Sequence, residues 1–63
     1  MKISGWFEVE NGVQQFDIKA ANMTDAAQQF MALDDDAGHT DMEATNEMGD
    51  DFTAELWQAI DRL

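Results

Sequence analysis

Apolar and polar side chains alternate on both sides of the dipeptide Asn11-Gly12, and this pattern constrains the N-terminal third of the chain most strongly. Asn-Gly favours a two-residue type I′ turn, because both residues tolerate a positive φ angle. If these residues form the loop, Glu10 lies opposite Val13 and the register of a β-hairpin follows. One face of the hairpin then carries Ile3, Phe7, Val9, Phe16 and Ile18.

The other face of the predicted hairpin is mainly polar. It carries Ser4, Trp6, Glu8, Glu10, Gln15, Asp17 and Lys19. A slip of one residue would mix the two sets, so the division supports the pairing. Gly5 then lies opposite Ile18, where a glycine indicates a bulge or the close approach of a helix. A two-stranded hairpin is not stable alone, so helices must cover its apolar face.

A helix is predicted over residues 23–33. Asn22 is a good N-cap, and Asp25 at the third helical position suits the positive end of the helix dipole. The apolar residues recur at three- and four-residue spacing and form one stripe. They are Ala26, Ala27, Phe30 and Leu33 or Met31.

The C-terminal segment predicts another helix, capped by Asp50 or Asp51. Its apolar stripe has helical spacing, with Trp57 at the edge. The stripe consists of Phe52, Leu56, Ala59, Ile60 and Leu63.

Residues 39–49 fit two structures. Thr40 and Glu43 match a capping box, which favours a short helix. Met42 and Ala44 alternate with polar residues, which favours an edge strand. We favour the helix because these residue types are poor strand formers.

A chain of 63 residues forms one domain at most, residues 1–63. The predicted fold is α+β, with an N-terminal antiparallel hairpin packed against two or three helices. The expected order is ββααα, or ββαβα if residues 39–49 form a strand. A domain of this size buries only about 60% of its unfolded surface, so its core must be small.

The charge is strongly unbalanced, with 14 acidic residues against 3 basic ones and a net charge of −11. No Lys or Arg occurs between Ala20 and Asp61, and residues 33–51 hold eight carboxylates. Such a surface repels nucleic acid and anionic lipid and attracts basic surfaces. The sequence therefore predicts a basic partner protein and no direct contact with nucleic acid or membrane. Without a signal peptide or an apolar span, we expect a cytoplasmic protein.

Catalytic and metal-binding patterns are weak. The chain has one His, one Ser, no Cys and no Tyr. Nothing brings Ser4 near His39, so a Ser–His–Asp arrangement is not indicated. An EF-hand loop fails whether Gly38 or Gly49 is placed at its sixth position, because other ligand positions are then apolar. We expect a non-enzymatic protein with no cofactor and no dedicated metal site.

Four carboxylates stand four residues apart: Glu43, Glu47, Asp51 and Glu55. On a helix such neighbours lie about 5–6 Å apart on one face, and each like-charged pair costs a few tenths of a kcal/mol. Their spacing resembles the advance of about 3.4 Å per nucleotide along a nucleic-acid strand. We predict that this row binds the partner; the alternative is a solvated polar face. Further predicted binding residues are Asp34, Asp35, Asp36 and Asp50.

Trp6 is predicted on the polar face of the hairpin, beside Glu8, Asp17 and Lys19. A tryptophan among acids is suited to anchor an interface and to stack on an arginine of the partner. The alternative is that it packs on a loop or covers Lys19.

In size, charge and lack of catalytic residues the chain resembles the small acidic phage proteins that inhibit host defence. These include anti-CRISPR and anti-restriction proteins, several of which mimic nucleic acid. The resemblance covers mainly residues 25–61. It implies a defence complex with a basic nucleic-acid-binding groove as partner, in the host cytoplasm. The alternatives are an acidic interaction module, such as an adaptor or toxin neutraliser, and a general halophile protein.

Overall fold

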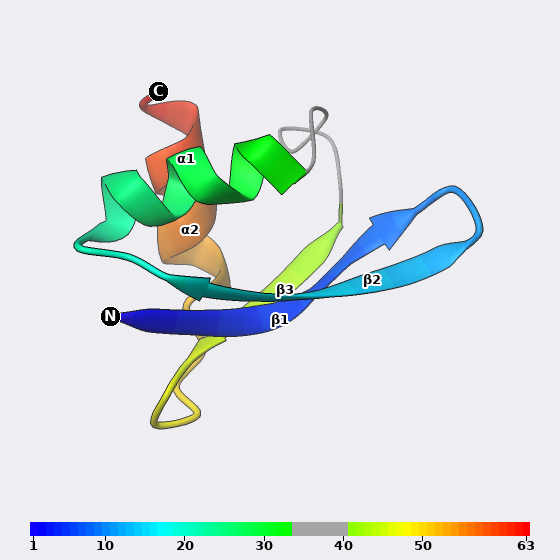
Figure 1. Ribbon diagram of the computed structural model, residues 1–63, viewed down its shortest axis with the longest axis horizontal. Helices are drawn as coiled ribbons and strands as arrows, with labels where there is room; N and C mark the ends of the chain where they lie inside the picture. Colours follow the sequence, from blue (N-terminus) through cyan, green and yellow to red (C-terminus); the bar gives the residue numbers. More distant parts are fainter. Residues whose placement is uncertain (34–40) are drawn as a thin grey trace.

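The computed structural model describes residues 1–33 and 41–63, which form a three-stranded antiparallel sheet with two helices on one face (Figure 1). The elements are β1 (Lys2–Val9), β2 (Gly12–Lys19), α1 (Met23–Leu33), β3 (Met42–Asn46) and α2 (Thr53–Asp61). The sheet order is β2-β1-β3, so β1 is the central strand. The α+β class is confirmed, and the order is ββαβα rather than the favoured ββααα.

The hairpin forms, but its predicted register is wrong by two residues. Val9 lies opposite Gly12 and Phe7 lies opposite Gln14, so Glu10 and Asn11 make the connection. Among the described residues only glycines have positive φ, Gly12 at 144°, which excludes a type I′ turn over residues 11–12. An even shift leaves each side chain on its predicted face.

The core lies between the sheet and the two helices. It consists of Ile3, Phe7, Phe16, Ile18, Ala20, Ala26, Ala27, Phe30, Met42, Ala44, Leu56, Ala59 and Ile60. The predicted apolar faces are therefore largely confirmed. Val9 and Leu63 are exposed, however, because they lie near the ends of their elements, and Phe52 is only half-buried.

Helix α1 has the predicted boundaries and the predicted N-cap. The backbone N–H of Asp25 donates to Oδ1 of Asn22 at 2.9 Å, and Oδ2 of Asp25 accepts from the N–H of Ala21 at 2.9 Å. These bonds pair backbone donors that have no partner within the helix. Of the two alternatives for the end of the stripe, Met31 is half-buried and Leu33 is exposed.

The helix favoured over residues 39–49 is wrong, because Met42–Asn46 forms strand β3 beside β1. Phe7 lies opposite Met42 and Gly5 lies opposite Ala44, and both β3 residues are buried in the core. Burial against the central strand and α2 outweighs the weak strand propensity of the sequence. Thr40 of the supposed capping box lies outside the described residues.

Gly5 marks a close approach, although the neighbour is a strand and not a helix. It lies between Phe16 and Ala44, not opposite Ile18. A Cβ atom at this position would stand 1.8 Å from the carbonyl oxygen of Glu43. Only glycine therefore allows β1 and β3 to come this close.

The outer edge of β3 is closed by residues 50–53. The N–H of Ala44 donates to Oγ1 of Thr53 at 3.0 Å, and the Thr53 hydroxyl donates to the carbonyl of Ala44 at 3.4 Å. The N–H of Phe52 donates to the same carbonyl at 2.8 Å, and the N–H of Asn46 donates to the carbonyl of Asp50 at 2.9 Å. Backbone groups that would otherwise offer a pairing edge are thus occupied.

Helix α2 begins at Thr53, with Phe52 at the N-cap position. Asp51 supplies the side-chain acceptor, because its Oδ1 accepts from the N–H of Thr53 at 2.9 Å. The predicted cap, Asp50 or Asp51, is therefore wrong: Phe52 holds the N-cap position without a side-chain cap hydrogen bond, and Asp51 accepts from one residue earlier. Hydrogen bonding to Thr53 lowers the pKa of Asp51. The stabilisation is present above the ordinary carboxyl pKa and is lost as the pH falls through the lowered value.

We expect Thr53→Val to destabilise the fold by about 1–3 kcal/mol, because the N–H of the buried Ala44 loses its acceptor while the side-chain volume is kept. Urea unfolding measures the loss, and amide exchange should accelerate at Ala44. Thr53→Ser is the matched control, since it keeps the hydroxyl. Equal midpoints for the valine variant and wild type would show that this contact does not stabilise the edge.

Candidate functional site: the open face of the sheet

One face of the sheet is left uncovered by α1 and α2, which both pack on the other side (Figure 1). We call it the open face. Alternation along the strands and the observed register assign its residues. They are Lys2, Ser4, Trp6 and Glu8 of β1, Val13, Gln15, Asp17 and Lys19 of β2, and Glu43 and Thr45 of β3.

Trp6 lies at the centre of this face, on the central strand. Its cross-strand neighbours are Gln15 on β2 and Glu43 on β3. Directly opposite residues on one face have Cβ atoms about 4.5–5.5 Å apart, so both reach the indole. The side chain is half-buried and does not belong to the core. The predicted face is correct, but Glu43 and Gln15, rather than Asp17 and Lys19, are its direct neighbours.

One end of the open face is acidic. Glu8 and Glu43 flank Trp6, and the N–H of Glu8 donates to the carbonyl of Asp41 at 2.8 Å. This bond continues the β1–β3 register by one residue, and alternation turns the Asp41 side chain to the open face. All three residues are exposed. Within the described part of the chain, their carboxylates make no hydrogen bond or ion pair. We call Glu8, Asp41 and Glu43 the acidic end.

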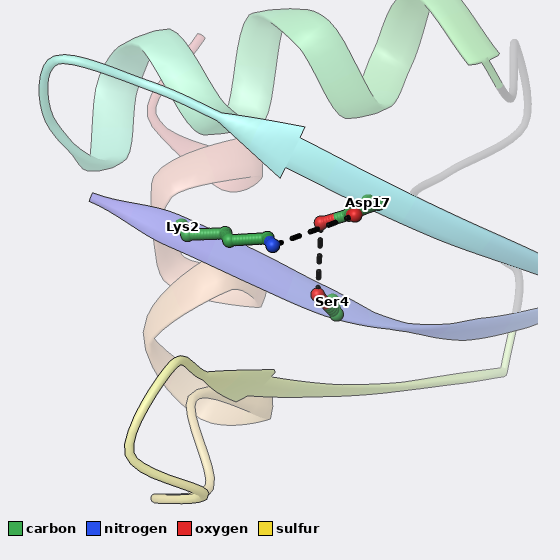
Figure 2. A network of polar contacts seen from close by, with 3 residues as sticks. All are labelled: Lys2, Ser4 and Asp17. Atoms are coloured by element: carbon green, nitrogen blue, oxygen red, sulfur yellow. Dashed lines mark hydrogen bonds and ion pairs between the residues drawn. The ribbon is translucent and has the colours of Figure 1, made fainter.

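The other end of the open face carries positive charge. Lys2 lies opposite Lys19, and the N-terminal ammonium of Met1 donates to the carbonyl of Ala20 at 2.7 Å. Figure 2 shows Asp17 between its two partners: Oδ1 accepts from the Ser4 hydroxyl at 3.0 Å and Oδ2 lies 3.8 Å from Nζ of Lys2. The open face is therefore polarised, with two of the chain's three basic side chains at one end.

The row of four carboxylates predicted on a helix does not exist. Glu43 lies on β3, Glu47 in the following turn, Asp51 in an isolated bridge to Thr45, and Glu55 in the first turn of α2. The structure brings only Glu43 beside Trp6. The predicted row is wrong because the chain changes from strand to turn to helix along it.

The other predicted binding residues have separate places. Glu47 shares a shallow hollow with Met1, Lys2, Lys19 and Ala20, so it lies near the positive end. Oδ2 of Asp50 accepts from the Asn46 side-chain amide at 3.3 Å, which holds the turn after β3. Asp34, Asp35 and Asp36 lie outside the described residues.

Glu8 and Asp41 were not singled out from the sequence. Glu8 was already on the polar face of the predicted hairpin, and its position next to Trp6 follows from strand alternation. Asp41 required the β1–β3 pairing, which joins residues distant in sequence. The alternative prediction, an edge strand within residues 39–49, would have placed Asp41 on this face once paired with β1.

The carboxylates point into solvent throughout the described chain. The structure describes eleven of the fourteen acidic residues; ten are exposed and Asp25 is half-buried. Among these residues, one ion pair forms, between Lys2 and Asp17. Apart from Asp17, the described carboxylates thus have no ion-pair partner among the described residues, and none is fully buried.

Within residues 1–33 and 41–63 no three His, Asp or Glu side chains converge as metal ligands would. No described helix has the length and apolar character needed to cross a membrane. A second shallow hollow lies on the open face and is lined by Ser4, Gly5, Gln15, Phe16, Asp17 and Thr45.

The chain was also compared with known proteins. No protein-family model, curated protein or solved structure matches it.

Proposed function

We propose that this protein is a non-enzymatic acidic inhibitor that occupies a basic, nucleic-acid-binding surface of a partner protein. The observation that carries the proposal is the display of negative charge: ten of the eleven described carboxylates are exposed, with a single ion pair among the described residues. A field of one sign accelerates encounter with a surface of the opposite sign. The same field repels nucleic acid itself, so competition for a shared protein surface is the consistent mode of action.

The spacing of Asp41, one residue before β3, and Glu43, on β3, supports mimicry of a pair of phosphates. Side chains two residues apart on one face of a strand advance about 6.6 Å. Two nucleotides advance about 6.8 Å along the axis of a nucleic-acid strand. Asp41 and Glu43 have this relation on the open face. Lysine and arginine side chains of a partner that are spaced to bind phosphates would therefore find these two carboxylates at a similar spacing.

The partner class follows from the resemblance to phage inhibitors of host defence. A CRISPR or restriction effector contains a basic groove for DNA or RNA, and blocking that groove requires no catalysis. We place the protein in the cytoplasm of such a host cell, where the effector acts. Its partner can be isolated from a bacterial lysate on the immobilised protein, eluted with rising salt and identified by mass spectrometry.

Neutralising the acidic end should weaken binding to the isolated partner. We expect the Glu8→Gln/Asp41→Asn/Glu43→Gln variant to lower the association rate constant by about tenfold or more, because charge steering is lost. The fold should remain intact, since these carboxylates hold no described hydrogen bond. Surface plasmon resonance at about 0.05 M and 0.2 M salt measures the effect, which should shrink with screening.

The matched control removes the same charge elsewhere, in Glu47→Gln/Glu55→Gln/Asp61→Asn. We expect a smaller loss for this control, and we expect the partner's own DNA or RNA to displace the wild-type protein. If neither variant weakens binding, or if nucleic acid does not compete, the proposed function is wrong. Equal losses in both variants would keep charge-driven inhibition but remove the acidic end as its site.

A further inference from the structure

We propose that Trp6 is the anchor of the interface and receives an arginine side chain of the partner, whose guanidinium stacks on the indole and pairs with Glu43. This inference rests on the proposed function and deepens it, because it names the recognised group and the residues that hold it. It also distinguishes arginine from lysine, which net charge alone does not.

Trp6 has the position of an interface anchor. It stands at the middle of the central strand on the face that neither helix covers, and it takes no part in the core. The other tryptophan, Trp57, packs against the core from α2. A large, half-buried aromatic on an open face offers contact area at a low cost in side-chain entropy, as anchors of interfaces do.

The groups around the indole match the chemistry of a guanidinium. Glu43 is the direct neighbour of Trp6 across the strand pair, and Glu8 follows two residues along β1 on the same face. A guanidinium is planar, stacks on aromatic rings and donates two parallel hydrogen bonds to a carboxylate. Trp6 and Glu43 supply both partners side by side. An ammonium group offers only a point charge in the same place.

The polarity of the open face favours one direction of binding. Lys2 and Lys19 lie at one end, and Glu8, Asp41 and Glu43 lie at the other. A basic segment laid across the sheet therefore has one favoured direction, with its arginine over Trp6 and its cations away from the two lysines. The closed outer edge of β3 leaves the face, rather than that edge, as the surface of approach.

The test uses two short peptides of equal length and charge, one alternating threonine with arginine and one alternating threonine with lysine. Trp57→Phe provides a background in which fluorescence reports on Trp6 alone. We expect the arginine peptide to bind about fivefold more tightly at low salt. It should change the Trp6 emission and shift the backbone amides of Trp6, Gln15 and Glu43 in NMR spectra.

Variants separate stacking from charge. Trp6→Leu should bring the two affinities to within about twofold of each other, whereas Trp6→Phe should keep part of the difference. Glu43→Gln should weaken the arginine peptide more than its matched control, Glu55→Gln, which removes an equally exposed carboxylate from α2. Circular dichroism confirms that each variant is folded before binding is measured.

The inference is overturned if wild type binds both peptides equally, if Trp6→Leu keeps the preference for arginine, or if the amide shifts fall on residues 47–51. Its failure is distinct from failure of the proposed function. Suppose that partner binding requires the acidic end and that nucleic acid displaces the protein, but that Trp6→Leu binds as well as wild type. The proposed function then stands, and the role of Trp6 as the anchor is refuted. If the arginine peptide is still preferred but nucleic acid does not compete with the protein for its partner, the anchor role of Trp6 stands and the proposed function is refuted.

Discussion

Replacing Phe30 with alanine is expected to leave most of the protein unfolded at 25 °C. Phe30 is 0% exposed, and its ring centroid lies 5.3 Å from that of Phe7 and 5.1 Å from that of Phe16. This cluster joins α1 to the sheet. Truncation of a buried phenylalanine costs about 3–5 kcal/mol. The core of a chain this short rarely supplies more than about 3–5 kcal/mol of stability, so little or none remains.

Urea unfolding, followed by far-ultraviolet circular dichroism, measures this loss. Val13→Ala is a suitable control, because Val13 is 62% exposed on β2 and its truncation should change stability by no more than about 0.5 kcal/mol. A Phe30→Ala protein with the wild-type midpoint would contradict the packing of α1 on the sheet.

The second large effect is expected at Gly5. In Gly5→Ala, the new methyl group would lie 1.8 Å from the carbonyl oxygen of Glu43, and the nearest atoms are backbone atoms that cannot rotate away. Strands β1 and β3 must separate to accept it. We expect a loss of about 3 kcal/mol or more, at the upper end of the range for overpacked sites.

Because the clash separates two paired strands, we expect it to change both the overall stability and the local contacts between these strands. The denaturation midpoint should fall, and NMR contacts between β1 and β3 should weaken before those between β1 and β2. Ser4→Ala, one residue earlier and half-buried on the open face, is the control and should have a small effect. Unchanged β1–β3 contacts in a stable Gly5→Ala protein would refute the close approach.

Local patterns were sufficient for the hairpin and the two helices. Alternation assigned Phe7 and Phe16 to the core face, and the Asn22 cap located the start of α1. The hairpin register was wrong because the loop consists of Glu10 and Asn11, with Gly12 opening β2. A turn preference for Asn-Gly is a local free-energy difference, and cross-strand packing of the whole hairpin outweighs it.

Local patterns favoured a helix where the structure has strand β3. Met42 and Ala44 fit either structure, and the choice depends on β1, which lies more than thirty residues earlier in the chain. The error passed on to the site, because Glu43 was placed on a helical row instead of beside Trp6. Trp6 itself was predictable, since its face depends only on alternation and survives a register shift of two residues.

The closed edge of β3 also determines how copies of this chain can associate. Residues 50–53 occupy the outer backbone groups of Ala44 and the N–H of Asn46 on β3, whereas β2 is the other edge and pairs with no further described strand. Fibre growth by strand addition needs two receptive edges on every copy, so that each arrival presents a new one. A molecule with one such edge joins a single partner through β2 and then terminates the sheet. The contacts that residues 50–53 make with Ala44 and Asn46 thus disfavour open-ended polymerisation through β3.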